Sequence, residues 1–163
     1  MMQIQKMTTQ YDAHEDRISL IAAIEGDQSI RFWLTRRFID RLVPHLTAWL
    51  QKHAVGAFAE DVLEFQQSHA GQNLKTETPV INTSDRSVLI DTIDLKSDND
   101  TIELVFNLEG EQYRILFSRY ALQQWLSIIL QTYQVAEWSI DSWPRWFKDS
   151  AKPAVHTSRS LIH

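Results

Sequence analysis

The sequence predicts an α+β fold made of two tandem copies of a β-β-β-α unit, and three observations support this prediction. A segment that begins at Asp16 and one that begins at Asp100 share a Glu-Gly pair, which ends at Gly26 in the first and at Gly110 in the second. Apolar residues alternate before the pair in both segments, which is typical of half-buried strands. An amphipathic helix pattern follows in both. We therefore expect one antiparallel sheet, or two small ones, covered by helices on one face, with a pseudo-twofold axis between the duplicated halves.

The first copy covers residues 1–53. Gly26 lies at the hairpin turn, which needs a positive φ that glycine adopts at little cost. The return strand leads to Thr35, whose hydroxyl can accept a hydrogen bond from a free backbone N–H at the start of a helix. Pro44 lies within that helix and predicts a kink or a restart. A further candidate strand at residues 2–8 completes the unit.

The second copy covers residues 85–138 and repeats these features. Gly110 lies at the turn, Ser118 lies at the helix start, and residues 87–95 form a β-rich run upstream. The two copies are expected to form a single domain over residues 1–140. The other parts are an extra helix at 54–70 with Phe58, Val62 and Phe65 on one side, a linker at 71–84 and a Trp-rich, mildly basic C-terminal tail at 141–163.

Composition narrows the classes of protein and of site. The chain has 163 residues, a formal net charge of −5 and no cysteine, which excludes disulfides, thiol catalysis and Cys-ligated zinc. The negative charge disfavours nucleic acids and anionic membranes as partners. No apolar run approaches the ~20 residues of a membrane span, and the N-terminus lacks the apolar core of a secretory signal. A cytoplasmic protein without a membrane partner is expected.

The densest basic cluster lies at the end of the first hairpin and the start of the first helix. Arginine suits the binding of phosphate or carboxylate groups, because its planar fork holds them with two hydrogen bonds. The alternative is a structural role, in which the arginines pair with acids such as Asp16 and Asp100. The candidate binding residues here are Arg31, Arg36, Arg37 and Arg41.

A second candidate site lies in the C-terminal stretch, where Trp143, Arg145 and Trp146 follow Trp138. Tryptophan and arginine dominate the energetics of protein interfaces, and aromatic rings also stack on nucleic-acid bases. The alternative is that the tail folds back and caps the core.

Catalytic and metal motifs are not found. Asp94, Asp98, Asp100 and Glu103 offer the oxygen ligands that calcium needs. However, the glycine and the terminal glutamate of an EF-hand are missing, and Ser97–Asp100 suits a hairpin turn. The six histidines lack metal-binding spacing, and the chain has no Gly-rich phosphate loop. We expect no enzyme, no metal and no cofactor.

The segment Arg31-Phe-Trp-Leu-Thr-Arg-Arg-Phe38 resembles a family of uncharacterised bacterial proteins with a strand-to-helix Trp-Leu-Thr-Arg-Arg motif. The resemblance spans roughly residues 15–138 and includes a later hairpin and helix that end near Ala136-Glu137-Trp138. It implies a bacterial origin and the boundaries of the domain, and it brings no known activity with it. In architecture alone, strands followed by a capped helix in tandem are similar to the Pur-alpha and Whirly class of single-stranded nucleic-acid-binding proteins.

These observations favour a non-enzymatic protein that works by binding another protein or a second copy of itself, as a homodimer. The alternative is a protein that binds single-stranded nucleic acid, and an enzyme of unrecognised class comes third.

Overall fold

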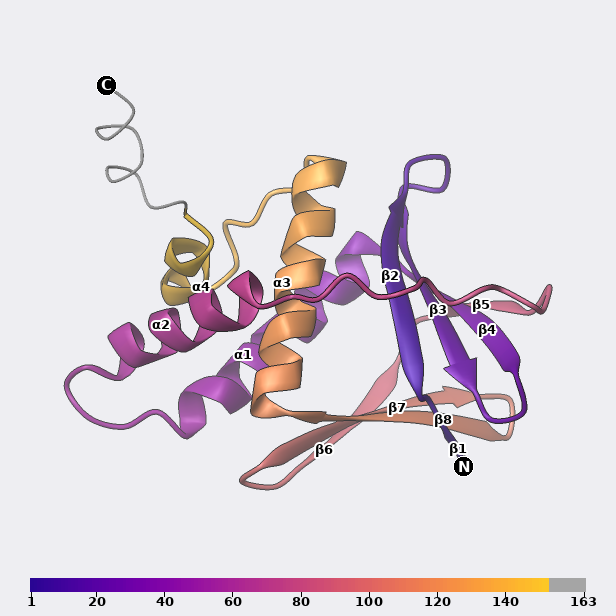
Figure 1. Ribbon diagram of the computed structural model, residues 1–163, viewed down its shortest axis with the longest axis horizontal. Helices are drawn as coiled ribbons and strands as arrows, with labels where there is room; N and C mark the ends of the chain where they lie inside the picture. Colours follow the sequence, from indigo (N-terminus) through magenta and orange to yellow (C-terminus); the bar gives the residue numbers. More distant parts are fainter. Residues whose placement is uncertain (153–163) are drawn as a thin grey trace.

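The computed structural model describes residues 1–152, and these residues form eight strands in two sheets together with four helices. The predicted α+β class is confirmed. The two sheets meet at an angle, and the helices lie to one side of them (Figure 1). The predicted tail begins at residue 141, and its residues 153–163 lie outside the described part of the chain.

Each sheet has four strands. In spatial order, the first sheet consists of β2 (Lys6–Asp12), β3 (Arg17–Ile24), β4 (Gln28–Leu34) and β5 (Ser87–Ile90). The second consists of β1 (Met2–Gln3), β8 (Glu111–Ser118), β7 (Thr101–Leu108) and β6 (Ile93–Ser97).

The two halves exchange their outermost strands. β1 pairs in parallel with β8 of the second half, and β5 pairs in parallel with β4 of the first half. The prediction of purely antiparallel sheets is therefore wrong, because each sheet contains one parallel pair. Each half also contributes four strands rather than three, since the runs at 2–8 and 87–95 both divide in two. The division has a visible cause in the first run: the N–H of Ile4 donates to Arg114 of the second sheet, and that of Gln5 donates to Ala23 of the first.

The hairpin turns have the predicted chemistry. Gly26 has a φ of 76° and Gly110 a φ of 86°, both in the left-handed region that glycine tolerates. A Cβ atom at either position would meet nothing within 4 Å, so the constraint is on the backbone conformation and not on space. The side chain of Asp98 accepts hydrogen bonds from the N–H groups of Asp100 and Thr101, which shows the turn at 97–100.

The two helices that follow the hairpins begin where the sequence places their caps. Thr35 Oγ1 accepts from the N–H of Phe38 at 3.1 Å, and Ser118 Oγ accepts from the N–H of Ala121 at 3.1 Å. The first helix continues through Pro44. The four helices are α1 (Arg36–Lys52), α2 (Ala59–Gln72), α3 (Arg119–Ala136) and α4 (Arg145–Ser150).

One core joins the inner faces of both sheets to the helices. The rings of Phe32 on β4 and Phe106 on β7 stack with centroids 4.8 Å apart, so the two sheets contact each other directly. The beginning of the predicted tail belongs to the same core, because Trp143, Trp146 and Phe147 are buried in it. None of the helices in residues 1–152 combines the length and the apolar character needed to cross a membrane.

Candidate protein interface

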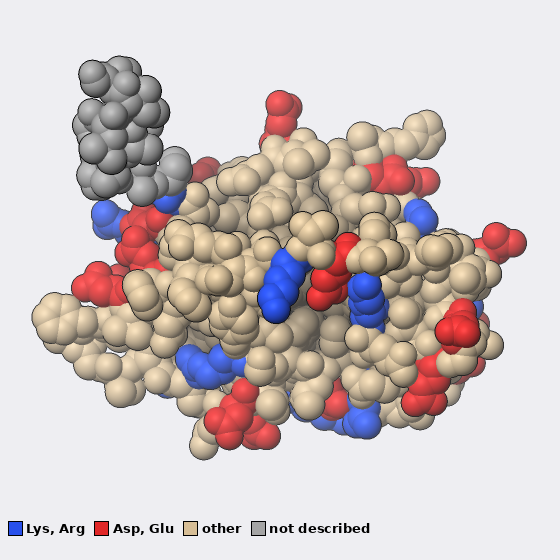
Figure 2. Space-filling view, in the orientation of Figure 1, with Lys and Arg blue, Asp and Glu red and all other residues tan. Residues whose placement is uncertain are grey.

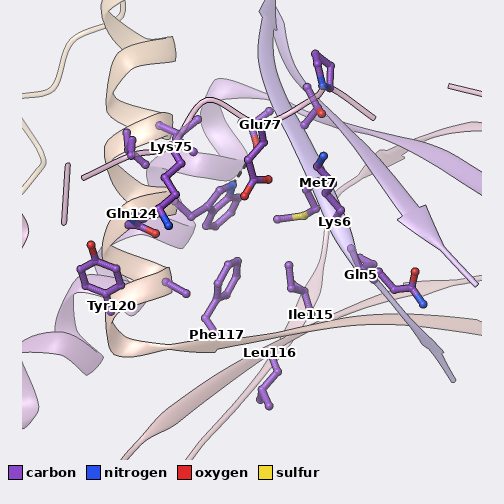
Figure 3. A pocket seen from close by; sticks show the side chains of 18 of the residues that line it. Gln5, Lys6, Met7, Lys75, Glu77, Ile115, Leu116, Phe117, Tyr120 and Gln124 are labelled. Atoms are coloured by element: carbon purple, nitrogen blue, oxygen red, sulfur yellow. Dashed lines mark hydrogen bonds between the residues drawn. The ribbon is translucent and has the colours of Figure 1, made fainter. Parts of the chain in front are cut away.

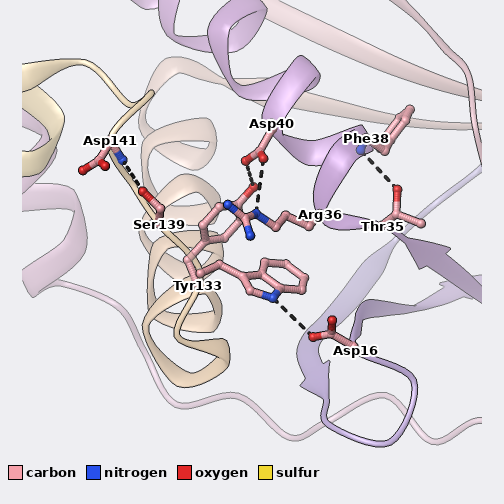
Figure 4. A network of polar contacts seen from close by, with 9 residues as sticks. Asp16, Thr35, Arg36, Phe38, Asp40, Tyr133, Ser139 and Asp141 are labelled. Carbon is pink, nitrogen blue, oxygen red and sulfur yellow. Dashed lines mark hydrogen bonds and ion pairs between the residues drawn. The ribbon is translucent and has the colours of Figure 1, made fainter.

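The structure places Arg36 in a polar contact between two helices (Figure 4). Its Nε lies 3.5 Å from Asp40 Oδ2, one turn further along α1. Asp40 Oδ1 accepts a hydrogen bond of 2.6 Å from the hydroxyl of Tyr133 on α3, and the side chain of Tyr133 is fully buried. Asp16, which the sequence offered as an arginine partner, instead accepts from the Tyr11 hydroxyl and the Trp138 indole. Asp40 therefore joins α1 to α3, and Arg36 pairs with the same carboxylate from within α1.

This contact predicts a change in stability at alkaline pH. Burial, and then the hydrogen bond to Asp40, raise the pKa of Tyr133 above its usual value. In the unfolded chain a tyrosine loses its proton near its usual pKa of about 10, whereas folded Tyr133 retains it. The free energy of unfolding is therefore unaffected by this group below about pH 10 and falls above it, by up to ~1.4 kcal/mol per pH unit. We expect Tyr133→Phe to cost about 1–2 kcal/mol at pH 7 and to flatten this alkaline loss. Urea unfolding at pH 7 and at several pH values above 10 measures both; equal slopes in the two proteins would contradict the prediction.

The other three candidate arginines lie in different surroundings. Arg31 is on β4, where its guanidinium lies 5.1 Å from the ring centroid of Trp33. Arg37 is exposed on the first turn of α1. Arg41, one turn further, lines a cavity of about 540 Å³ between α1 and β6. The structure therefore does not combine the predicted arginines into one anion-binding cluster.

The C-terminal candidates are split between core and surface. Trp143 and Trp146 are buried, and Trp143 packs edge-on against Tyr133. Arg145 is exposed, with its Nε 3.6 Å from Asp149 Oδ2. The two indole rings are therefore already covered by the protein and offer no free face for a partner.

A further candidate site, which was not predicted from the sequence, is an exposed apolar stripe on α2. Phe58, Val62 and Phe65 are 72%, 47% and 72% exposed, although they form the apolar side of this helix. The helix begins at Ala59 and not at residue 54, because Gly56 has a φ of 103° and residues 55–58 form a loop. Figure 1 shows α2 at the margin of the molecule, away from both sheets.

The opposite side of α2 explains this orientation. Gln67 is buried, and its amide donates to the carbonyl of Gln123 at 2.7 Å and to Ser127 Oγ at 2.8 Å, both on α3. Gly71 permits the close approach, since a Cβ atom there would lie 3.0 Å from Ser127 Oγ. Gln67 therefore faces α3 together with the buried Leu63 and Ala70, and the side of α2 that carries Phe58, Val62 and Phe65 is left in solvent.

The stripe continues past Phe65 to a shallow hollow. The ring of His69 lies 6.3 Å from that of Phe65 and 6.3 Å from that of Tyr120 at the start of α3. The hollow has a volume of about 410 Å³ and is bounded by Arg119 on its far side. We call Phe58, Val62, Phe65 and His69 the α2 stripe. Such an exposed apolar patch, bordered by polar residues, is typical of a protein interaction site.

The structure also has a groove of about 790 Å³ (Figure 3). It lies between α3, β2, β8 and the segment 73–79, and it has an apolar floor and charged side chains on its rim. Trp125 Nε1 in the floor donates to Thr9 Oγ1 at 3.1 Å. The cavity beside Arg41 occupies the corresponding place against α1 and β6. The fold therefore forms two grooves, each between the helix of one half and the edge strand of the other.

On the face shown in Figure 2, lysine and arginine side chains lie singly among carboxylates. Within residues 1–152, no group of three His, Asp or Glu side chains is placed to hold a metal ion.

Comparison of the chain with protein-family models, with curated proteins and with solved structures finds no match in any of the three. The geometry of the molecule is therefore the basis for the proposals that follow.

Proposed function

We propose that this protein works by binding and that its α2 stripe packs against the α2 stripe of a second copy. The observation that supports this proposal is the exposure of Phe58, Val62 and Phe65 along one side of a folded helix. The two phenylalanines alone present roughly 250 Å² of apolar surface, given the usual area of an aromatic side chain. Burying that surface between two copies removes it from water on both.

The spacing of the stripe suits a helix partner. Its members follow one another at intervals of four, three and four residues, which keeps them on one side of an α-helix. The same alternation forms the seam of coiled coils, where apolar side chains of two helices interlock. A helix of α2's length, about 21 Å, can bury the stripe along its whole length.

Charge favours an antiparallel pair of identical helices. Glu60, Asp61 and Glu64 lie in the first half of α2, whereas His69 and Arg119 lie near its other end. A twofold axis would place the acidic half of one copy beside the basic end of the other, and the helix dipoles would oppose. A parallel pair would instead place carboxylates against carboxylates. The surface is thus complementary to itself in the antiparallel orientation.

In this antiparallel pair, the aromatic rings of one copy would also contact the stripe of the other. The centre of the stripe lies between Val62 and Phe65, so each of these residues would face the other across the axis. Phe58 would then lie opposite His69 of the second copy, beside the hollow that borders Tyr120. Each copy would fill the other's hollow with an aromatic ring, as in well-packed interfaces.

Phe65→Ser tests the proposal, with light scattering of the full-length chain over a range of concentrations. The wild type is expected to be a dimer, and the variant's dissociation constant is expected to rise about 100-fold or more, because a twofold interface loses the ring twice. Val135→Ser is the matched control, since Val135 is 71% exposed on α3 and lies outside the stripe. A wild type that remains a monomer at about 100 μM, which would mean a dissociation constant well above the micromolar range, or equal loss in both variants, would overturn the proposal.

The orientation has its own test, because the chain has no cysteine and an engineered one is unique. Gln66→Cys lies near the proposed axis and should form a disulfide between copies under oxidation. Ala57→Cys lies at the end of the stripe, where an antiparallel pair holds the two thiols too far apart to join. A disulfide at Ala57→Cys and none at Gln66→Cys would exclude the antiparallel arrangement.

A further inference from the structure

The outer faces of the two sheets differ at one pair of matching positions. In the second sheet, Arg114 on β8 pairs with Glu103 on the neighbouring strand β7, with Nη1 and Oε1 3.3 Å apart. Arg114 lies opposite Val105, and Glu103 lies opposite Leu116, so the pair is diagonal across the ladder. The side chain of Glu103 is only 15% exposed. This face therefore supplies its own counter-ion to its arginine.

The first sheet has the arginine without the carboxylate. Arg31 on β4 lies opposite Ile21, and Ser19 on β3 lies opposite Trp33, in the same diagonal relation. Ser19 thus takes the position of Glu103. Ser19 is fully buried, and within the described residues neither its Oγ nor the buried Nε of Arg31 has a hydrogen-bond partner. Buried polar groups are normally paired, and a partly buried arginine most of all.

The edge strands next to these positions differ in the same way: the strand of the second sheet carries charged residues there, and the strand of the first sheet carries uncharged ones. In the second sheet, β6 places Asp94 opposite Val105 and Lys96 opposite Glu103. In the first sheet, β2 places Thr8 opposite Ile21 and Gln10 opposite Ser19. The second face therefore balances two acids with two bases, whereas the matching four positions of the first face hold a single positive charge and no acid.

The surroundings of Arg31 hold its guanidinium in place. The group lies 5.1 Å from the ring centroid of Trp33, within the range of a cation–π contact. Thr8 is already engaged, because its Oγ1 accepts from the N–H of Val80 at 2.7 Å. The unsatisfied hydrogen-bonding capacity on this face is therefore concentrated at Arg31 and Ser19.

We infer that Arg31 and Ser19 bind an oxyanion, the carboxylate or phosphate group of a ligand, in the position that Glu103 fills in the second sheet. One oxygen accepts from the Arg31 guanidinium, and the Ser19 hydroxyl donates to the same group. Charge-assisted hydrogen bonds of this kind are the stronger ones, and the guanidinium fork fits both anions. The site is separate from the α2 stripe and does not depend on self-association.

Nuclear magnetic resonance tests the site on the full chain, with sodium phosphate, sodium acetate and sodium chloride as probes. Phosphate or acetate should shift the Arg31 Nε–H and Trp33 Nε1–H resonances to saturation, and chloride at matched ionic strength should not. Whichever of the two binds more tightly identifies the source of the oxyanion. Equal shifts with chloride would mean an adventitious ion only and would overturn the inference.

Variants in both sheets provide matched controls. Arg31→Gln should weaken binding about tenfold or more, whereas Arg114→Gln should leave it unchanged. Glu103→Ser should create a second site at Arg114, because it removes the counter-ion of this arginine and places a serine in the position that Ser19 has beside Arg31. Ser19→Glu should abolish binding by supplying the carboxylate; if that variant does not fold, the other three decide. Unchanged binding in Arg31→Gln, or no new site in Glu103→Ser, would contradict the inference.

A short labelled oligothymidine serves as a last probe. Binding that requires Arg31, and that is far tighter than binding of phosphate itself, would assign the oxyanion to a nucleic-acid backbone. Binding that Arg31→Gln leaves intact would instead separate nucleic acid from this site and count against the inferred phosphate source.

Discussion

Replacing Phe32 with alanine is expected to lower the free energy of unfolding by about 3–5 kcal/mol, the usual cost of removing a buried phenyl ring. Phe32 is fully buried, stacks on Phe106 and also meets Tyr113 edge-on. These contacts join β4 of the first sheet to β7 and β8 of the second. The substitution therefore leaves a cavity at the junction of the sheets, where rigid strands on both sides limit collapse.

Urea unfolding followed by circular dichroism measures this loss. Leu116→Ala is the control, because Leu116 is 54% exposed on the outer face of β8 and should change stability by less than about 1 kcal/mol. Combining Phe32→Ala with Phe106→Ala should cost less than the sum of the two, since each ring loses its partner in the other's variant. Equal effects of Phe32→Ala and Leu116→Ala would show that the two sheets do not pack through this pair.

Trp143→Ala is expected to destabilise the protein by about 3–5 kcal/mol, although it lies in the segment that the sequence suggested as a tail. Its ring packs against Tyr133 of α3 and against Phe147 of α4, with centroids 5.4 and 4.8 Å apart. α4 in turn packs on α2. Loss of the indole therefore loosens the contact of α4 with the helices beneath it.

Thermal unfolding of Trp143→Ala and of Arg145→Ala separates the two interpretations of this segment. If the segment caps the core, Trp143→Ala lowers the melting temperature by many degrees, whereas Arg145→Ala, at a highly exposed side chain, leaves it almost unchanged. If the segment were a free docking arm, neither substitution would alter stability. A wild-type melting temperature in Trp143→Ala would reject the capping role.

The local features of the fold could be predicted from the sequence because they depend on residues near one another. Gly26 and Gly110 define the hairpins, and Thr35 and Ser118 define the helix starts, since turn and cap chemistry acts over a few residues. The exchange of β1 and β5 could not be predicted in this way. A parallel pairing between distant strands leaves no periodic signal in either strand, and β1 has only two residues.

For the candidate sites as well, the residue types could be predicted from the sequence, whereas their placement by long-range contacts could not. Composition located the aromatic and basic residues, but it could not tell that Trp143 lies inside and Phe65 outside. The apolar stripe of α2 was visible in the sequence, and its direction was not, because that direction depends on hydrogen bonds from Gln67 to a helix more than fifty residues away. Ser19 carried no signal alone; its importance comes from the comparison with Glu103.

The exchanged strands also bear on how the chain comes to fold. Met2 pairs with Tyr113, and Leu34 pairs with Ile90, so neither sheet can be completed from its own half. During synthesis the edge of β4 stays open until residues 87–90 emerge from the ribosome, and β1 has no partner until β8 follows. Contacts of such large sequence separation slow folding, because the chain must close long loops before it gains them. The halves therefore gain their final stability together, late in folding, and an unfinished chain exposes strand edges on which another chain can pair.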